Sequence, residues 1–189
     1  MLDYSKFAVI LDPGHSKETP GKRSPYSANK VLPGIDFYEY QFNREVTAIL
    51  KRMLENQGID VFVTTDEDRD GTSDLGLTAR ANRANDYAKK TDKKCIFISI
   101  HANAFGNGSS WSSPCGWSIY TTKGQNNSDK LATCIWNAAN DIFPAKSYNM
   151  RKESSDGDPD YEENFTVIYK TNMPAVLTEN FFYTNIKDT

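Results

Sequence analysis

The chain has 189 residues, an apolar content of 38% and a formal net charge of −3. A chain of this length can bury most of the surface that its unfolded form exposes, so it can fold as one domain without disulfides. The weak negative charge argues against a nucleic-acid-binding protein, which would need a basic face. The three cysteines, Cys95, Cys115 and Cys134, have no CxxC spacing, and we interpret them as reduced thiols.

Nothing in the sequence indicates a membrane protein or an exported one. No apolar run reaches the ~18–20 residues that a membrane-spanning helix needs. Residues 1–6 lead directly into the first apolar run, without the charged and then apolar pattern of an export signal. We therefore expect a monomer that is made in the cytoplasm without an export signal in this chain and has no membrane partner.

Short apolar runs alternate with helical patterns along the chain. Apolar residues at helical spacing predict helices over 38–57, over 77–88 and from Ser128, the expected cap, to 142. Polar loops cover 16–36 and 147–163. The remaining runs have the composition or alternation of strands and cover residues 7–11, 59–63, 95–101, 116–122 and 174–180, with a shorter apolar run at 165–169. This order predicts one α/β domain with a twisted, mostly parallel sheet of about six strands and helices on both faces.

Three of the apolar runs end on a side chain that can perform chemistry. His15 follows the first run, His101 ends the run that begins at Cys95, and Glu179 ends the last one. Parallel strands bring their carboxyl ends to one edge of a sheet, where ligands and catalytic groups gather. We therefore expect these three side chains to be neighbours, although they are far apart in the sequence.

Two histidines and one carboxylate are a ligand set that catalytic zinc uses, with one position left for water. The third ligand has to be a carboxylate at the same edge. Glu39 lies in the first turn of the first predicted helix, which starts at this edge because it follows the first strand. Each residue alone has a simpler interpretation, as a hydrogen-bonded histidine or a helix-end charge. Their convergence raises the metal site to equal standing with these simpler interpretations and does not by itself decide between them.

Four motifs surround these residues in the order LDPGH (11–15), EYQFN (39–43), SIHANA (99–104) and PAVLTENFF (174–182). They resemble the motifs of the zinc-dependent N-acetylmuramoyl-L-alanine amidases of the amidase-3 type, which cleave bacterial peptidoglycan and include phage endolysins and bacterial autolysins. The segment LTARANRAN (77–85) also resembles the family's pattern. The similarity runs from about Phe7 to Asn185.

The resemblance implies that His15, Glu39 and His101 bind one Zn²⁺ ion per chain and that Glu179 is the catalytic carboxylate. The implied substrate is peptidoglycan of the bacterial cell wall, cleaved at the amide bond between N-acetylmuramic acid and L-alanine of the stem peptide. The family commonly has an arginine where this chain has Asp66, and a closing helix after its last strand. We expect residues 1–189 to be the zinc amidase catalytic domain without that C-terminal helix, and to include no wall-binding domain.

Residues beside the predicted ligands allow two interpretations each. Asp12 and Asn103 could orient a histidine ligand through a hydrogen bond, or could simply form turns. We interpret Gly14 as the residue that permits a sharp turn. Lys22 and Arg23 could contact acidic stem peptides, or could be solvated loop charges.

Two more distant features have alternatives as well. Trp111 and Trp117 flank the loop after His101, where they could stack on substrate or belong to the core. Acidic residues at 156, 158 and 160 suggest a calcium loop but lack the later glutamate of an EF-hand, so we favour an acidic loop.

Other functions fit the sequence less well. A serine hydrolase would need a GxSxG motif, and neither histidine has such a serine context. A glycosidase that used Glu39 and Glu179 would leave both histidines without a role. The main alternative is a non-catalytic peptidoglycan-binding module on the same zinc scaffold, and the presence of Glu179 argues against it.

Overall fold

The computed structural model describes residues 3–25, 36–65 and 75–189, so Asp66 and part of the first polar loop lie outside the described residues. The strands are β1 (Phe7–Pro13), β2 (Asp60–Val63), β3 (Lys94–Asn103), β4 (Ser118–Thr121), β5 (Tyr161–Glu162) and β6 (Ala175–Phe182). The helices are α1 (Glu39–Glu55), α2 (Leu77–Lys90), α3 (Asn127–Ile142) and α4 (Thr166–Tyr169), with short 3-10 turns at Tyr4–Lys6 and Pro144–Lys146.

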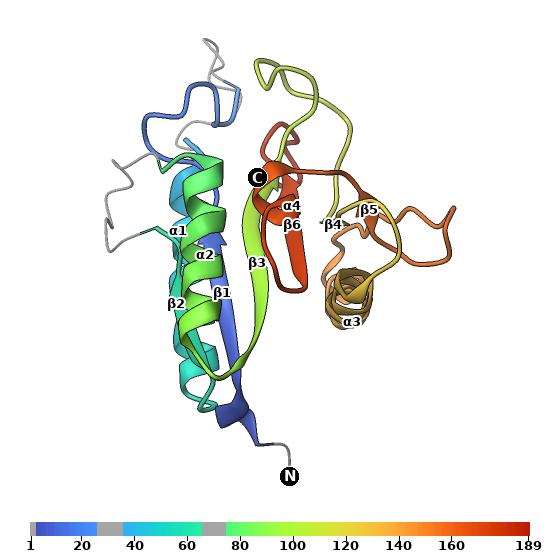
Figure 1. Ribbon diagram of the computed structural model, residues 1–189. Helices are drawn as coiled ribbons and strands as arrows, with labels where there is room; N and C mark the ends of the chain where they lie inside the picture. Colours follow the sequence, from blue (N-terminus) through green and yellow to red (C-terminus); the bar gives the residue numbers. More distant parts are fainter. Residues whose placement is uncertain (1–2, 26–35, 66–74) are drawn as a thin grey trace.

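The six strands form one sheet in the order β2-β1-β3-β6-β4-β5 (Figure 1). Strands β1, β2, β3 and β6 run parallel, and β5 is parallel to β4. Among the six strands that the structure describes, β4 and β6 form the antiparallel pair. The predicted α/β fold with a mostly parallel sheet of about six strands is therefore confirmed.

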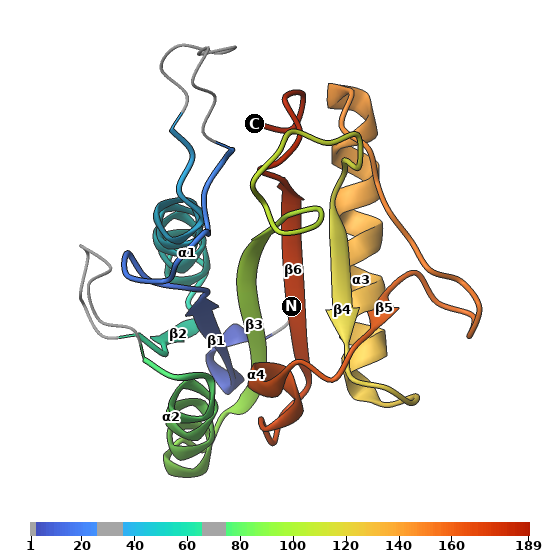
Figure 2. The same ribbon diagram turned by 90° about the horizontal axis from the view of Figure 1, so that it is seen from above.

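Helices cover both faces of the sheet, α1 and α3 on one and α2 and α4 on the other (Figure 2). The alternation of side chains along each strand creates these two faces. In β1, Val9 and Leu11 pack under α1, whereas Ile10 belongs to the cluster that includes Ala84 of α2. The result is a three-layer domain whose parallel strands end at a common edge. None of the described helices is both long and apolar enough to cross a membrane.

The structure corrects three local predictions. The apolar run at 165–169 forms a single helical turn, α4, and the loop predicted for 147–163 contains the short strand β5. The cap of α3 is Asn126, which forms a reciprocal capping box with Asp129, while Ser128 lies inside the helix. The antiparallel direction of β4 was also not predicted, because periodicity carries no information on strand direction.

Candidate metal centre

His15 lies on a turn just after β1 whose backbone is held by side chains from two helices. Asn43 Nδ2 of α1 donates to the Gly14 carbonyl at 3.0 Å, and Arg44 Nη1 donates to the His15 carbonyl at 3.0 Å. Arg80 Nη1 of α2 donates to the Pro13 carbonyl at 2.7 Å. His15 has φ +61°, a conformation that is uncommon for a residue with a side chain. These bonds fix that conformation and hence the direction of the imidazole.

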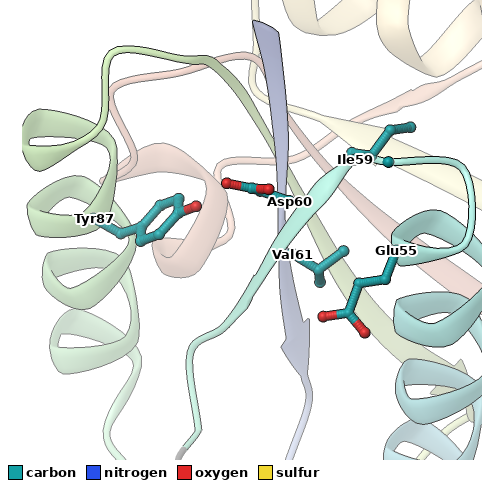
Figure 3. Close-up of a pocket in the computed structure, with 6 residues that line it drawn as sticks. Glu55, Ile59, Asp60, Val61 and Tyr87 are labelled. Atoms are coloured by element: carbon teal, nitrogen blue, oxygen red, sulfur yellow. The ribbon is translucent and has the colours of Figure 1, made fainter. Parts of the chain in front are cut away.

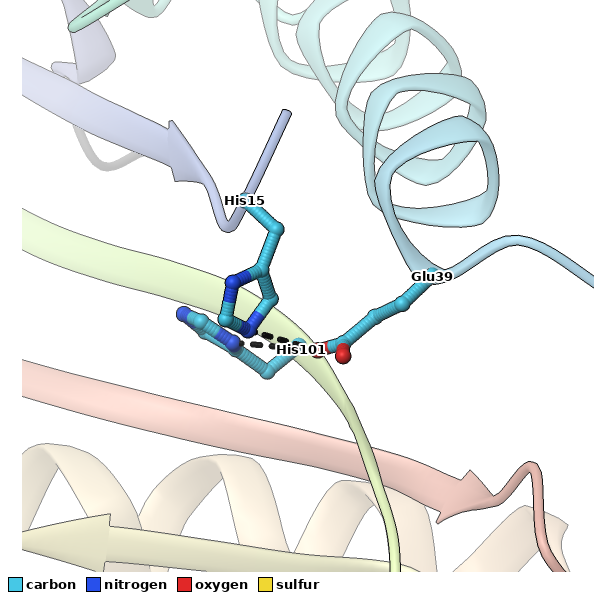
Figure 4. A group of neighbouring side chains, drawn as sticks. All are labelled: His15, Glu39 and His101. Atoms are coloured by element: carbon cyan, nitrogen blue, oxygen red, sulfur yellow. Dashed lines mark hydrogen bonds and ion pairs between the residues drawn. The ribbon is translucent and has the colours of Figure 1, made fainter. Parts of the chain in front are cut away.

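Glu39 begins α1 and points at both histidines (Figure 4). A bridge between Arg23 and Tyr38, together with the bond from the Glu39 amide to the Lys22 carbonyl at 3.0 Å, sets the start of this helix. Glu39 Oε1 lies 3.3 Å from His15 Nε2 and 3.2 Å from His101 Nδ1. The predicted convergence of His15, Glu39 and His101 is therefore found, with potential ligand atoms within 4.8 Å of one another.

Gly14 is required by a close approach rather than by a sharp turn. A Cβ atom on Gly14 would lie 2.2 Å from His101 Cε1, far inside van der Waals contact. The positive φ in this turn belongs to His15 instead. The predicted reason for a glycine at position 14, a sharp turn, is therefore wrong. The glycine is needed because it makes room for the His101 ring.

The donor set and its surroundings fit a zinc ion. Glu39 is fully buried, and although burial opposes its ionisation, the bonds to His101 and His15 hold its pKa below the ordinary value. Its second oxygen, Oε2, is buried and has no hydrogen-bond partner within residues 3–25, 36–65 and 75–189. Burial lowers the pKa of His15, which favours the neutral imidazole that a metal binds. For His101, burial acts in the same direction, but the bond to Glu39 outweighs it and raises the pKa.

Glu179 stands beside this centre without being part of it. It is paired with His101 across β3 and β6, and its buried Oε2 has no hydrogen-bond partner in the part of the chain that the structure describes. Burial raises the pKa of Glu179 to about 7. A carboxyl group with such a pKa can both accept and release a proton near neutral pH.

A cleft with a volume of about 640 Å³ opens over the centre and is lined by His15, Glu39, His101 and Glu179. Lys22 also lines it, whereas Arg23 does not. Its lining also includes residues 164–167, which lead into α4 and form the first half of that helix. Volume and lining are compatible with an extended polar substrate.

A second hollow lies at the outer edge of the sheet (Figure 3). Glu55, Asp60 and Tyr87 line it, and Asp60 pairs with Ala8 near the start of β1. It is therefore at the opposite end of the strands from the histidines, and its lining contains neither of them. We assign no chemistry to it.

The residues proposed to orient the histidines have other partners. Asp12 accepts bonds from Ser99 at 2.8 Å, from Arg80 at 3.0 Å and from Thr64. Asn103 Oδ1 accepts from the Ala104 amide at 2.8 Å. The sequence analysis did not identify Arg80 as a positioning residue, although it lies in the LTARANRAN segment. Its buried ion pair with Asp12 ties α2 to the end of β1.

Two other sequence alternatives are resolved by the structure. Trp117 is 3% exposed, packs in the core and donates from Nε1 to Asn180 Oδ1 at 2.8 Å. The Asn180 side chain in turn donates to the His101 carbonyl at 2.8 Å. Trp117 is thus a core residue that fixes the strand next to the centre. Trp111 is half-buried and does not line the cleft.

Fold and site together define an α/β protein with a His, Glu, His cluster and a separate carboxylate in one cleft, a donor set found in zinc hydrolases. The sequence profile of the amidase-3 family, described as N-acetylmuramoyl-L-alanine amidase, matches residues 9–189. The chain therefore belongs to this family.

Individual relatives agree with this assignment. The chain is 29% identical over 180 residues to the N-acetylmuramoyl-L-alanine amidase CwlM of Bacillus licheniformis, covering 95% of this chain and 58% of the relative. The crystal structure of an N-acetylmuramoyl-L-alanine amidase from Clostridium difficile 630 superposes with a TM-score of 0.74 at 26% identity, over 97% of this chain and 84% of that one. The catalytic domain of CwlV from Bacillus (Paenibacillus) polymyxa var. colistinus gives a TM-score of 0.65 at 26% identity, over 96% and 83%.

Proposed function

We propose that this chain is the catalytic domain of a zinc-dependent amidase that hydrolyses the bond between N-acetylmuramic acid and L-alanine in bacterial peptidoglycan. The observation that carries the proposal is the meeting of His15, Glu39 and His101 with the buried carboxyl group of Glu179 in one cleft. Membership of the amidase family supports the reaction and the substrate class. We further propose that the domain acts on the cell wall as a monomer.

His15, Glu39 and His101 would hold the zinc ion. When bound, zinc polarises the amide carbonyl and lowers the pKa of water toward ~7, which makes a nucleophile available at neutral pH. The fold holds both imidazole rings in fixed positions and leaves no room for a side chain at position 14. The three ligands therefore need little rearrangement when the metal binds.

Glu179 is the proposed general base and acid. As a carboxylate it takes a proton from the attacking water while the water oxygen forms a bond to the amide carbon. It then returns that proton to the alanine nitrogen as the carbon–nitrogen bond breaks, and the peptide leaves with a free amine. The second proton of the water stays on the new carboxyl group of the glycan until that group ionises. The pKa of about 7 suits a group that must both accept and donate.

Digestion of purified cell walls tests the proposal. Mass spectrometry of the products should find stem peptides that begin with a free L-alanine amine and glycan strands with intact sugar links. Cleavage between sugars would instead support a glycosidase. A protein that sediments with the walls and releases no peptide would support the alternative of a binding module. Products cut at a peptide bond inside the stem would also contradict the proposed bond.

A further inference from the structure

A second cluster of ionisable side chains lies at the other end of β4, away from the cleft. Asp129 belongs to the first turn of α3, and Asp158 and Asp160 belong to the loop just before β5 (Figure 2). One carboxylate oxygen from each of the three residues lies within 4.8 Å of the others. Asp160 is fully buried, Asp129 is 3% exposed and Asp158 is half-buried. This corrects the interpretation of the 156–160 run as only an acidic loop.

The cluster has no basic partner. No Lys or Arg in the described part of the chain forms an ion pair with Asp129, Asp158 or Asp160. Asp158 Oδ1 and Asp160 Oδ1 are buried, and neither has a hydrogen-bond partner among the described residues. Since a buried carboxylate normally pairs with a positive charge or a metal ion, the arrangement requires a compensating cation or proton.

Neutral donors cannot balance the charge. The Thr121 hydroxyl lies 2.6 Å from Asp160 Oδ2 and 3.1 Å from Asp129 Oδ1, but it has a single proton to donate. Gln125 Nε2 donates to Asp158 Oδ2 at 3.0 Å, and the Asn126 amide donates to Asp129. These bonds orient four of the six carboxylate oxygens, and among the described residues they leave Oδ1 of Asp158 and of Asp160 free for another ligand.

We infer that Asp129, Asp158 and Asp160 form a structural calcium site, separate from the catalytic centre and independent of the proposed function. The donor set is entirely oxygen, which suits a hard cation rather than zinc. Two oxygens that each lie ~2.3–2.6 Å from one calcium ion can be up to about 5 Å apart, and the observed cluster falls within that limit. Magnesium needs shorter bonds and keeps more of its water, so it fits less well.

The site has a mechanical consequence for the cleft. Calcium would join the start of α3 to the loop that enters β5, and β5 leads directly to residues 164–167 in the cleft wall. Two bonds already connect the same segments, from the Lys123 amide to Asn164 Oδ1 at 3.0 Å and from the Gly124 amide to Glu162 Oε1 at 2.7 Å. The ion would therefore restrain the segment that carries residues 164–167 of the cleft lining, although the ion itself would lie outside the cleft.

The test is calcium binding by the full zinc-loaded chain in calcium-free buffer. We expect calorimetric titration with CaCl₂ to give about one ion per chain. At free calcium about 100 times the dissociation constant, the Tm should rise by about 5–10 °C. An equal rise with MgCl₂ at the same concentration would overturn the assignment to calcium. So would the absence of saturable binding up to about 10 mM, which is beyond the weakest sites of this kind.

Variants locate the site. Asp160→Asn and Asp158→Asn should each weaken calcium binding at least tenfold, because each removes a charged ligand. Asp156→Asn is the matched control, since Asp156 lies in the same loop but is exposed and outside the cluster. The calcium affinity of Asp156→Asn should stay within about twofold of the wild-type value. If the two cluster variants bind calcium like the wild type, or if the control loses binding equally, the inference is wrong. Should Asp160→Asn fail to fold, Asp158→Asn at the half-buried position decides alone.

Discussion

The two clusters of ionisable side chains differ in how their charge is balanced. In the His15, Glu39 and His101 centre, one carboxylate oxygen lies between two imidazole nitrogens, and backbone and arginine contacts hold every member. In the Asp129, Asp158 and Asp160 cluster, three carboxylates face one another, and the donors found for them among the described residues are all neutral. The first can keep its shape without metal because its members pair with each other. The second has only like charges, so its loop should depend on the cation for its order.

The donor atoms also separate the two clusters by metal. Two nitrogens and one oxygen suit zinc, whereas three carboxylate oxygens suit calcium. The comparison therefore predicts that each cluster can be disabled without affecting the other. The His15, Glu39 and His101 centre should control the reaction rate, and the Asp129, Asp158 and Asp160 cluster should control thermal stability.

The largest expected effect comes from removing one of the proposed metal ligands. His15→Ala or His101→Ala should lose zinc and about 10³-fold or more in wall hydrolysis, because a catalytic metal contributes several kcal/mol and each ~1.4 kcal/mol is tenfold. Metal analysis and product release measure both. Glu45→Ala, an exposed glutamate on α1, serves as the control and should keep both. If a histidine variant keeps its zinc, that histidine is not a ligand. If a histidine variant loses its calcium binding as well as its zinc, the two clusters are not independent.

The second effect separates chemistry from metal binding within the cleft. Glu179→Gln should keep zinc and the Tm but lose at least ~10²-fold in rate, the lower end of what general acid–base catalysis contributes. The change is nearly isosteric, and the oxygen Oε2 accepts no bond that would be lost. Glu55→Gln, at an exposed position on α1, is the control. Near-normal turnover would remove Glu179 from the mechanism, whereas loss of zinc would make it a ligand.

A smaller effect tests the fit around His101. Gly14→Ala should force the His101 ring to move and weaken zinc binding about 10–100-fold, the range seen when groups that orient metal ligands are disturbed. Gly76→Ala is the matched control, because no atom lies within 4 Å of its Cβ position and its φ is not in the left-handed region. Competition with a zinc chelator gives the two affinities. Equal affinities in both variants would show that the ring tolerates the added carbon.

The smallest effect concerns the pH dependence of the aspartate cluster. Burial, together with Asp158 and Asp129, raises the pKa of Asp160 to about 7 from 3.8 in the calcium-free protein. A raised pKa means that its stabilising contribution is complete below pH ~3.8 and is lost as the pH rises toward 7. The Tm of the wild type relative to Asp160→Asn should therefore fall by about 2–4 °C between pH 5 and 8. Saturating calcium should abolish this fall, and a difference that does not change with pH would contradict it.

The positions that the sequence identified share a physical cause. His15, His101 and Glu179 follow apolar runs that are buried on both faces, and parallel strands necessarily end at one edge. Glu39 could be added because its helix must start where β1 ends. The side chains that hold the centre could not be found in this way. Arg80 acts on backbone carbonyls more than 60 residues away, and no periodicity reports such a bond.

The aspartate cluster shows the same limit more clearly. The spacing of Asp156, Asp158 and Asp160 is visible in the sequence, but their exposure is not. Asp129 joins them only because α3 folds back against the loop. The exposed member of the run, Asp156, is the one that stays outside the cluster. Local composition therefore indicated the loop but not which of its carboxylates are buried.

The turn at residues 13–15 has a consequence for how the protein fails when heated. Its carbonyls are held from one face of the sheet by Asn43 and Arg44 and from the other by Arg80. If either layer of helices detaches, the orientation of the His15 side chain is no longer fixed. Inactivation should thus coincide with the cooperative melting of the whole sheet, rather than precede it as a local loss in an otherwise native protein.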